Sequence, residues 1–123
     1  MARLKTGIRV SAILRRAQRA GAFAAVLRRG DPDAGALWVI VRKGAELFRY
    51  TEQMAMSGGR EWYQDGPFEE AELGLRTNKA VDTDPDIWIV EVEDIEGRAF
   101  LDGDMAKEET AAEVAARALF RGR

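Results

Sequence analysis

The chain lacks two residue types altogether, cysteine and histidine. Without cysteine there is no disulfide, no thiolate nucleophile and no zinc–sulfur site. Without histidine there is no Ser-His-Asp triad, no histidine general base and none of the usual histidine-containing metal sites. These two absences exclude the commonest catalytic machinery, and they favour a binding protein without a cofactor over an enzyme.

Long apolar runs and glycine-rich phosphate loops are also missing. The longest apolar segment, 34–41, is interrupted by Gly35 and is far shorter than the roughly 20 residues of a membrane-spanning helix. The glycines within 30–35 and 57–60 fit turns, and their spacing differs from that of loops that cradle phosphates between a strand and a helix. We therefore expect no membrane segment.

What the chain does contain is the composition of one globular domain. Its 123 residues are 46% hydrophobic and 33% charged, which is enough to bury a core without disulfide support. The charge is unevenly placed, because residues 1–29 carry eight basic side chains and no acidic one, although the whole chain has a net charge of -2. This asymmetry fits an anionic partner, or attraction between the two parts of the chain within one copy or across a dimer.

Helical periodicity is clearest over residues 8–21. Apolar residues recur on one face at the helical period, and four arginines lie on the opposite side: Arg9, Arg15, Arg16 and Arg19. Thr6 suits the N-cap position, and Gly21 suits the end of the helix. The arginine face either binds phosphate groups or is a solvated face that pairs with carboxylates.

The remaining pattern predicts strands that alternate with helices. Strands are expected at 23–29, 36–43, 46–51, 61–64 and 87–94, and further helices at 68–81 and 108–120. Turn residues predict one hairpin between the first two strands and another between the last strand and residues 98–101. The order predicts an α+β fold: a mainly antiparallel sheet of about five to six strands with an N-terminal amphipathic helix, a middle helix and a C-terminal helical tail. We place one domain at 1–104 and a helical extension at 105–123.

Two Asp-Pro-Asp corners carry the most conspicuous charges. In RRGDPDAG, residues 28–35, proline between aspartates with a closing glycine is strong turn chemistry. This corner also presents both signs of charge, so its candidate contacts are Arg28, Arg29, Asp31 and Asp33. In DTDPD the candidate metal ligands are Asp82, Asp84 and Asp86, but Ile87 replaces the glycine that a calcium loop requires. A solvated turn and a looser magnesium site both remain open there.

Two of these segments carry a family resemblance. RAQRAGAFAAVLRRGDPDAGALWVIV at 16–41 and DPDIWIVEVEDIEGRAFL at 84–101 resemble a family of short alphaproteobacterial proteins of unknown function, domain-of-unknown-function family 1491. The resemblance covers roughly residues 1–102. It implies a bacterial cytosolic protein and directs attention to the corners at 31–33 and 84–86, but it implies no activity, cofactor or catalytic residue.

Three functional hypotheses follow from the sequence. The first is a small non-enzymatic binding or interaction module, as a homo-oligomer or with a protein partner, whose surface combines the arginine helix, the first corner and an exposed aromatic pair, Trp62 and Tyr63. The second is an anion or RNA binder through the arginine helix, although the net negative charge and the lack of a recognisable module fit nucleic acid poorly. The third is a divalent-metal hydrolase that uses Asp82, Asp84 and Asp86.

Overall fold

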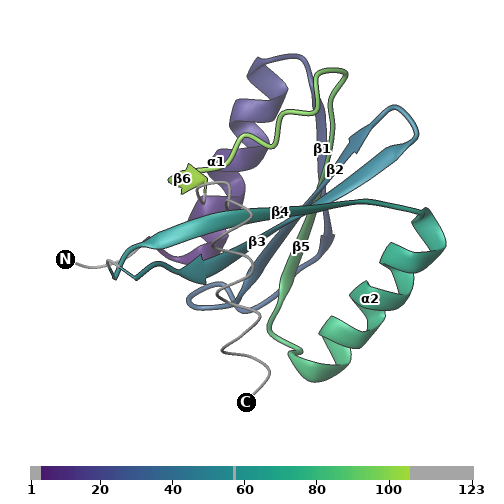
Figure 1. Ribbon diagram of the computed structural model, residues 1–123. Coiled ribbons are helices and arrows are strands. Elements are labelled where there is room, and N and C mark those ends of the chain that lie inside the picture. Colours follow the sequence, from purple (N-terminus) through teal and green to yellow (C-terminus); the bar gives the residue numbers. More distant parts are fainter. Residues whose placement is uncertain (1–3, 57, 106–123) are drawn as a thin grey trace.

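The computed structural model describes residues 4–56 and 58–105. These residues form two helices and six strands in the order α1 (Thr6–Arg19), β1 (Phe23–Arg28), β2 (Leu37–Lys43), β3 (Glu46–Met54), β4 (Arg60–Phe68), α2 (Glu70–Thr83), β5 (Trp88–Glu93) and β6 (Asp104–Met105) (Figure 1). The predicted α+β class is confirmed. Neither helix in this part of the chain is long and apolar enough to cross a membrane. The predicted helix at 108–120 lies outside the described residues.

All six strands form one sheet in the order β1-β5-β2-β3-β4-β6. The prediction of a mainly antiparallel sheet needs correction, because the sheet is mixed. Strand β5 runs parallel to β2 and antiparallel to β1, and the short β6 runs parallel to β4. The reason is α2, which carries the chain from the end of β4 back across the sheet, so that β5 enters it in the same direction as β2.

Two predicted hairpins, between the strands at 23–29 and 36–43 and between the strand at 87–94 and residues 98–101, are wrong, whereas β2 and β3 do form the expected hairpin. Strands β1 and β2 follow one another in the chain, but β5 lies between them in the sheet. Residues 98–101 form no strand, because both edges of β5 are already paired, with β1 and with β2. The turn residues on which both predictions relied specify a change of direction and do not specify which strand fills the neighbouring place.

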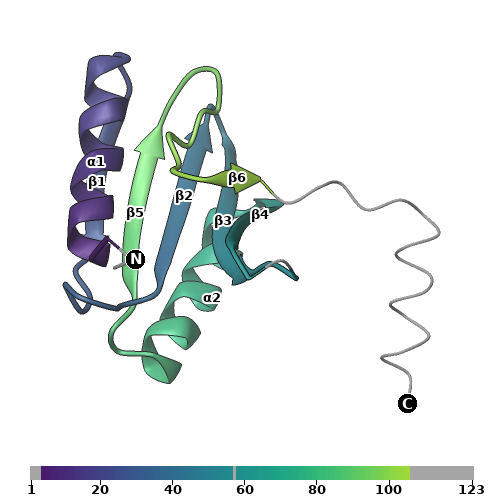
Figure 2. The same cartoon turned by 90° about the vertical axis from the view of Figure 1, so that its left-hand side faces the viewer.

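The two helices cover opposite faces of the sheet (Figure 2). Val10 and Ile13 of α1 pack into a buried cluster with alternate residues of β2 and β5, such as Val90. Leu73 of α2 packs on the other face with residues such as Ile89. Because neighbouring side chains of a strand point to opposite faces, an almost continuous apolar strand such as β5 can supply both layers of the core.

Candidate functional site

The two Asp-Pro-Asp corners meet in the structure, although 53 positions separate them in the chain. The backbone N–H of Asp31 donates to the carbonyl of Asp86 at 2.9 Å, and Arg28 Nη2 donates to the carbonyl of Pro85 at 2.8 Å. A Cβ atom at Gly30 would lie 2.1 Å from that same Asp86 oxygen, so the close approach requires glycine. The first corner is therefore explained by packing, without a ligand.

The same corner also completes the start of α1. Carbonyl oxygens of Pro32 and Asp33 accept the backbone N–H groups of Gly7 at 2.9 Å and Thr6 at 3.4 Å, which have no partner inside the helix. The N-cap prediction for Thr6 is wrong, because Lys5 occupies that position and makes no side-chain cap. The Thr6 hydroxyl is buried and instead donates to the carbonyl of Gly35 at 2.8 Å.

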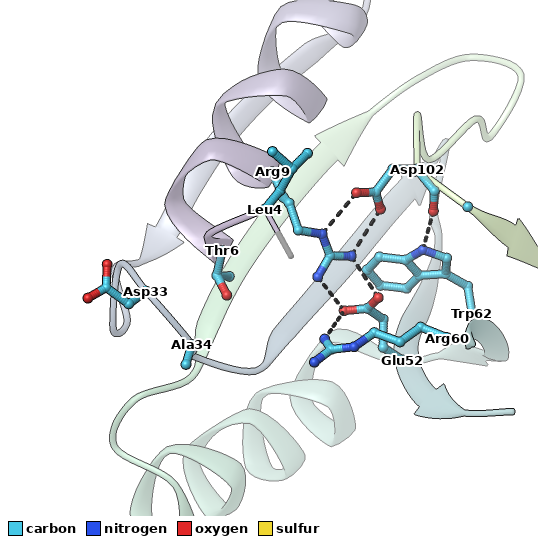
Figure 3. Close-up of a pocket in the computed structure, with 10 residues that line it drawn as sticks. Leu4, Thr6, Arg9, Asp33, Ala34, Glu52, Arg60, Trp62 and Asp102 are labelled. Carbon is cyan, nitrogen blue, oxygen red and sulfur yellow. Dashed lines mark hydrogen bonds and ion pairs between the residues drawn. The ribbon is translucent and has the colours of Figure 1, made fainter. Parts of the chain in front are cut away.

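Beside this junction lies a pocket of about 470 Å³ (Figure 3). The start of α1, the loop at 33–34, the end of β3, the beginning of β4 and the segment 102–103 all contribute to its wall. Its charged lining residues come from distant parts of the chain: Arg9, Asp33, Glu52, Arg60 and Asp102. The tertiary fold therefore brings together charges that show no common motif in the sequence.

Arg9 is held by two carboxylates at once. Its Nη1 and Nη2 atoms donate to Glu52 at 2.9 and 2.6 Å, and its Nε and Nη2 atoms donate to Asp102 at 2.9 and 3.0 Å. The Arg9 and Glu52 side chains are only 11% and 10% exposed. The hydrogen bond from Arg9 lowers the pKa of Asp102 against the opposing effect of burial, and the same bonds raise the pKa of Arg9. Asp102 is therefore ionised at neutral pH and is unsuited to donate a proton.

Trp62 forms the buried side of this arrangement. The prediction that it is exposed is wrong, because it is 1% exposed and belongs to the core cluster under α1. Its Nε1–H donates to the backbone carbonyl of Asp102 at 2.6 Å, and the guanidinium of Arg9 lies 5.8 Å from its ring centre. Tyr63 is partly buried and donates its hydroxyl to Glu61 at 3.2 Å. Trp62 and Tyr63 therefore do not form the expected exposed aromatic patch.

The predicted arginine face divides into two parts. Arg9 enters the pocket, and Arg16 donates through Nε and Nη2 to the carbonyl of Phe100 at 3.0 and 2.7 Å. Arg15 and Arg19 are exposed. Arg29 is also exposed and lies 5.5 Å from the ring centre of Trp88. Only part of the face is thus available to an external anion.

The second corner shows no grouping of carboxylates around a common point. Asp84 Oδ1 accepts the backbone N–H of Asp86 at 3.1 Å, while Asp82 and Asp86 are exposed. Over residues 4–56 and 58–105, no three acidic side chains gather closely enough to hold a metal ion. The hydrogen bond from Asp86 to Asp84 is that of an ordinary turn.

A further surface, which the sequence did not indicate, is the free edge of β1. Within the described part of the chain β1 pairs with β5 alone, and its Phe23 and Leu27 side chains are 63% and 55% exposed. No charged residue occurs from Ala20 to Leu27. The sequence prediction missed this edge because it placed residues 36–43 against it, whereas that strand pairs with β5 and β3.

Comparison with known proteins identifies related proteins, but none of the matches reported below is described with an activity. The model of the family described as "Protein of unknown function (DUF1491)" matches residues 4–102. A crystal structure of a DUF1491 protein from Caulobacter crescentus is 39% identical, with a TM-score of 0.79 over 85% of this chain and 100% of that one. The solution structure of protein Atu0922 from A. tumefaciens is 28% identical, with a TM-score of 0.73 over 89% of this chain and 100% of that one. No curated protein matches the chain.

Proposed function

Because the chain belongs to the DUF1491 family of unknown function, as its sequence resemblance predicted, we propose its role from its surface: a non-enzymatic interaction module that forms a homodimer through the free edge of β1. The proposal includes a bacterial cytoplasmic setting, which the alphaproteobacterial relatives and the cysteine-free composition favour. The observation that carries it is the uncharged, apolar edge of β1, which has no strand on its outer side among the residues that the structure describes.

The contrast between the two edges of the sheet supports this choice. Beyond β4 the sheet continues into β6 at Glu61 and Trp62, and the rest of β4 carries Asp65 and Pro67. Charges, proline and a covering segment are the usual devices that prevent pairing at a sheet edge. Between Phe23 and Leu27, β1 has no charge and no proline, and no described strand pairs with its outer edge; its one irregularity is a β-bulge between Val26 and Arg28. Such an edge offers backbone N–H and C=O groups to another strand.

A two-fold antiparallel pairing suits the side chains of this edge. If the pair is centred on Ala25, Phe23 of one copy lies beside Leu27 of the other, and the two exposed apolar side chains cover each other. The arginines that end each β1 then lie at opposite ends of the pair, near the exposed Glu93 that neighbours Phe23 in the sheet. A parallel pairing would instead bring the arginines of both copies together.

The other two hypotheses receive less support from the geometry. Two of the four helix arginines, Arg9 and Arg16, are engaged within the chain, which weakens the case for an anion or RNA site on α1. The Asp82, Asp84 and Asp86 carboxylates form no common ligand group, which weakens the case for a metal-dependent hydrolase. The interaction module is the reading that depends on neither site.

Sedimentation at micromolar concentration tests the dimer. The wild-type chain should sediment at twice the 13.7 kDa mass of one copy, and the double variant Phe23→Lys/Leu27→Lys should sediment as a monomer, because two charges would then face the edge. Both side chains are largely exposed, so the variant should keep its fold, which circular dichroism can verify.

A matched double variant, Met54→Lys/Met56→Lys, places the same charges on exposed apolar positions at the end of β3, which is three strands away from β1 in the sheet. It should remain a dimer. A wild-type protein that sediments at 13.7 kDa, or an edge variant that still dimerises, would refute the proposed role of β1.

A further inference from the structure

The pocket beside Arg9 carries charges that a β1 dimer leaves unexplained. Four ionic side chains in its wall, Arg9, Arg60, Glu52 and Asp102, sum to no net charge. A fifth, Asp33, lies 3.4 Å from Lys5 at the exposed rim. The pocket volume of about 470 Å³ is within the range of small-molecule sites. A ligand can pair only with those charged groups whose hydrogen-bonding capacity is not already used within the chain.

Arg9 is not free. Four hydrogen bonds tie its guanidinium to Glu52 and Asp102, and its side chain is 11% exposed. Both oxygens of Glu52 are engaged by Arg9, and Glu52 is equally buried. The Arg9–Glu52 ion pair is therefore a fixed part of the pocket wall, because breaking it to bind a ligand would leave a buried charge without a partner.

Arg60 and Asp102 do have unused capacity. Among the described residues, the ionic contact of Arg60 is 3.4 Å long, from Nη1 to a Glu52 oxygen that Arg9 already occupies, and the Arg60 side chain is 43% exposed. Its remaining N–H donors can therefore hold an anionic group in the usual forked geometry. Asp102 is 35% exposed, and each of its oxygens accepts one bond from Arg9, which leaves lone pairs for an ammonium group.

We infer that this pocket binds a small zwitterion of the amino-acid class, with the ligand carboxylate on Arg60 and its ammonium group on Asp102. Figure 3 shows the two side chains on either side of the Arg9–Glu52 pair, so the pocket offers a cation and an anion at separate places. A ligand with one charge would leave one of these two groups desolvated without a partner. A zwitterion matches both groups and keeps the site neutral.

The surroundings leave room for the rest of such a ligand. A second hollow of about 390 Å³ adjoins the pocket and shares Ala34, Glu52 and Arg60 with it. Its wall includes Trp38 and Met54, so an apolar ligand side chain finds apolar surface beyond Arg60. Free amino acids and short peptides share this chemistry, and probes of both kinds separate the two sources.

Titration of the ¹⁵N-labelled full chain, followed by amide chemical shifts, tests the inference. The probes are glycine, L-leucine, 4-aminobutyrate and the dipeptide Gly-Leu, with propionate and propylamine as analogues that carry one charge each. At least one zwitterion should shift the amides of Glu52, Arg60 and Gly103, with a dissociation constant at least tenfold lower than that of either analogue. Stronger binding by Gly-Leu than by every free amino acid would assign the site to peptide ends.

Two variants separate the site from general effects of charge. Arg60→Gln should weaken zwitterion binding at least tenfold, whereas Arg76→Gln, which removes an exposed arginine paired with Glu72 on α2, should leave it unchanged. The inference is overturned if no zwitterion shifts these amides at any soluble concentration, if propionate binds as tightly, or if Arg60→Gln binds as well as the wild type. The readout is independent of the oligomeric state, so failure of the β1 dimer would not affect it.

Discussion

Arg9 and Glu52, 43 positions apart in the chain, meet in a two-bond ion pair with N–O distances of 2.9 and 2.6 Å. The pair ties α1 to the end of β3, and Asp102 extends it to the segment after β5. Because both side chains are nearly buried, the contact differs from the exposed ion pairs elsewhere on this protein. It fixes the position of α1 over the sheet and forms the wall of the pocket.

Replacement of Arg9 should therefore destabilise the protein markedly. Arg9→Met should lower the free energy of unfolding by about 2–4 kcal/mol, because the Glu52 carboxylate would remain buried without its partner. Arg9→Lys should recover little, since an ammonium group cannot form two parallel bonds to each carboxylate. Urea denaturation at pH 7 measures both changes. Arg76→Met, which breaks an exposed pair with Glu72, should cost less than about 1 kcal/mol, and an equal cost for the two sites would contradict the prediction.

Asp94 should make stability depend on pH in the acid range. Hydrogen bonds from the Arg98 side chain and backbone lower the pKa of Asp94 from 3.8 to about 2. A carboxyl group with a lowered pKa in the folded state stabilises it fully above its unfolded pKa, and this contribution disappears as the pH falls from about 4 towards 2. Asp94→Asn should thus be less stable than the wild type at pH 7, with a gap that narrows towards pH 2. Urea denaturation midpoints of the wild type and of Asp94→Asn, measured from pH 7 to pH 2 with the exposed Glu93→Gln as control, give this difference in stability. A difference that stays constant with pH would refute the lowered pKa of Asp94.

Replacement by alanine should have opposite effects at Gly30, where the two corners meet, and at Gly74 in α2. Gly30→Ala should destabilise the fold by roughly 1–3 kcal/mol, because its Cβ would meet the backbone of Asp86 and Ile87 at 2.1 and 2.6 Å. Gly74→Ala, inside α2 with no atom within 4 Å of the new Cβ, should stabilise it by about 0.5–1 kcal/mol. Thermal unfolding of both variants and the wild type measures these changes in stability. A neutral Gly30→Ala variant would mean that the corners can separate at little cost.

The Thr6 hydroxyl provides a test of the junction between α1 and the first corner. Thr6→Val keeps the shape of the side chain but removes the donor to the Gly35 carbonyl, so stability should fall by about 1–2 kcal/mol. Thr6→Ser keeps the donor and should lose less. If urea denaturation ranks serine below valine, then packing of the methyl group, and not the hydrogen bond, holds this junction.

Local sequence patterns predicted most of the secondary structure, but of the pocket they indicated only Arg9, Asp33 and Trp62 as candidate residues and not their association. The helix at 8–21 and the strands at 36–43 and 87–94 correspond to α1, β2 and β5 within two residues at each end, because periodic apolar residues report which side of an element is buried. Glu52, Arg60 and Asp102 stand among ordinary surface charges in the sequence, and no spacing rule connects them to Arg9. Trp62 was misjudged for a similar reason, since a short aromatic segment beside glycines does not reveal that α1 covers it.

The amino-acid sequence by itself determined the α+β class, the position of the turns, the family and the absence of histidine and cysteine chemistry, because each of these depends on residue type and short-range spacing. Only the tertiary structure decided that β5 enters between β1 and β2, which leaves β1 with a single partner among the described strands and brings the two Asp-Pro-Asp corners into contact. Strand order depends on which apolar surfaces cover one another across the whole chain, and local turn chemistry carries no information about that choice.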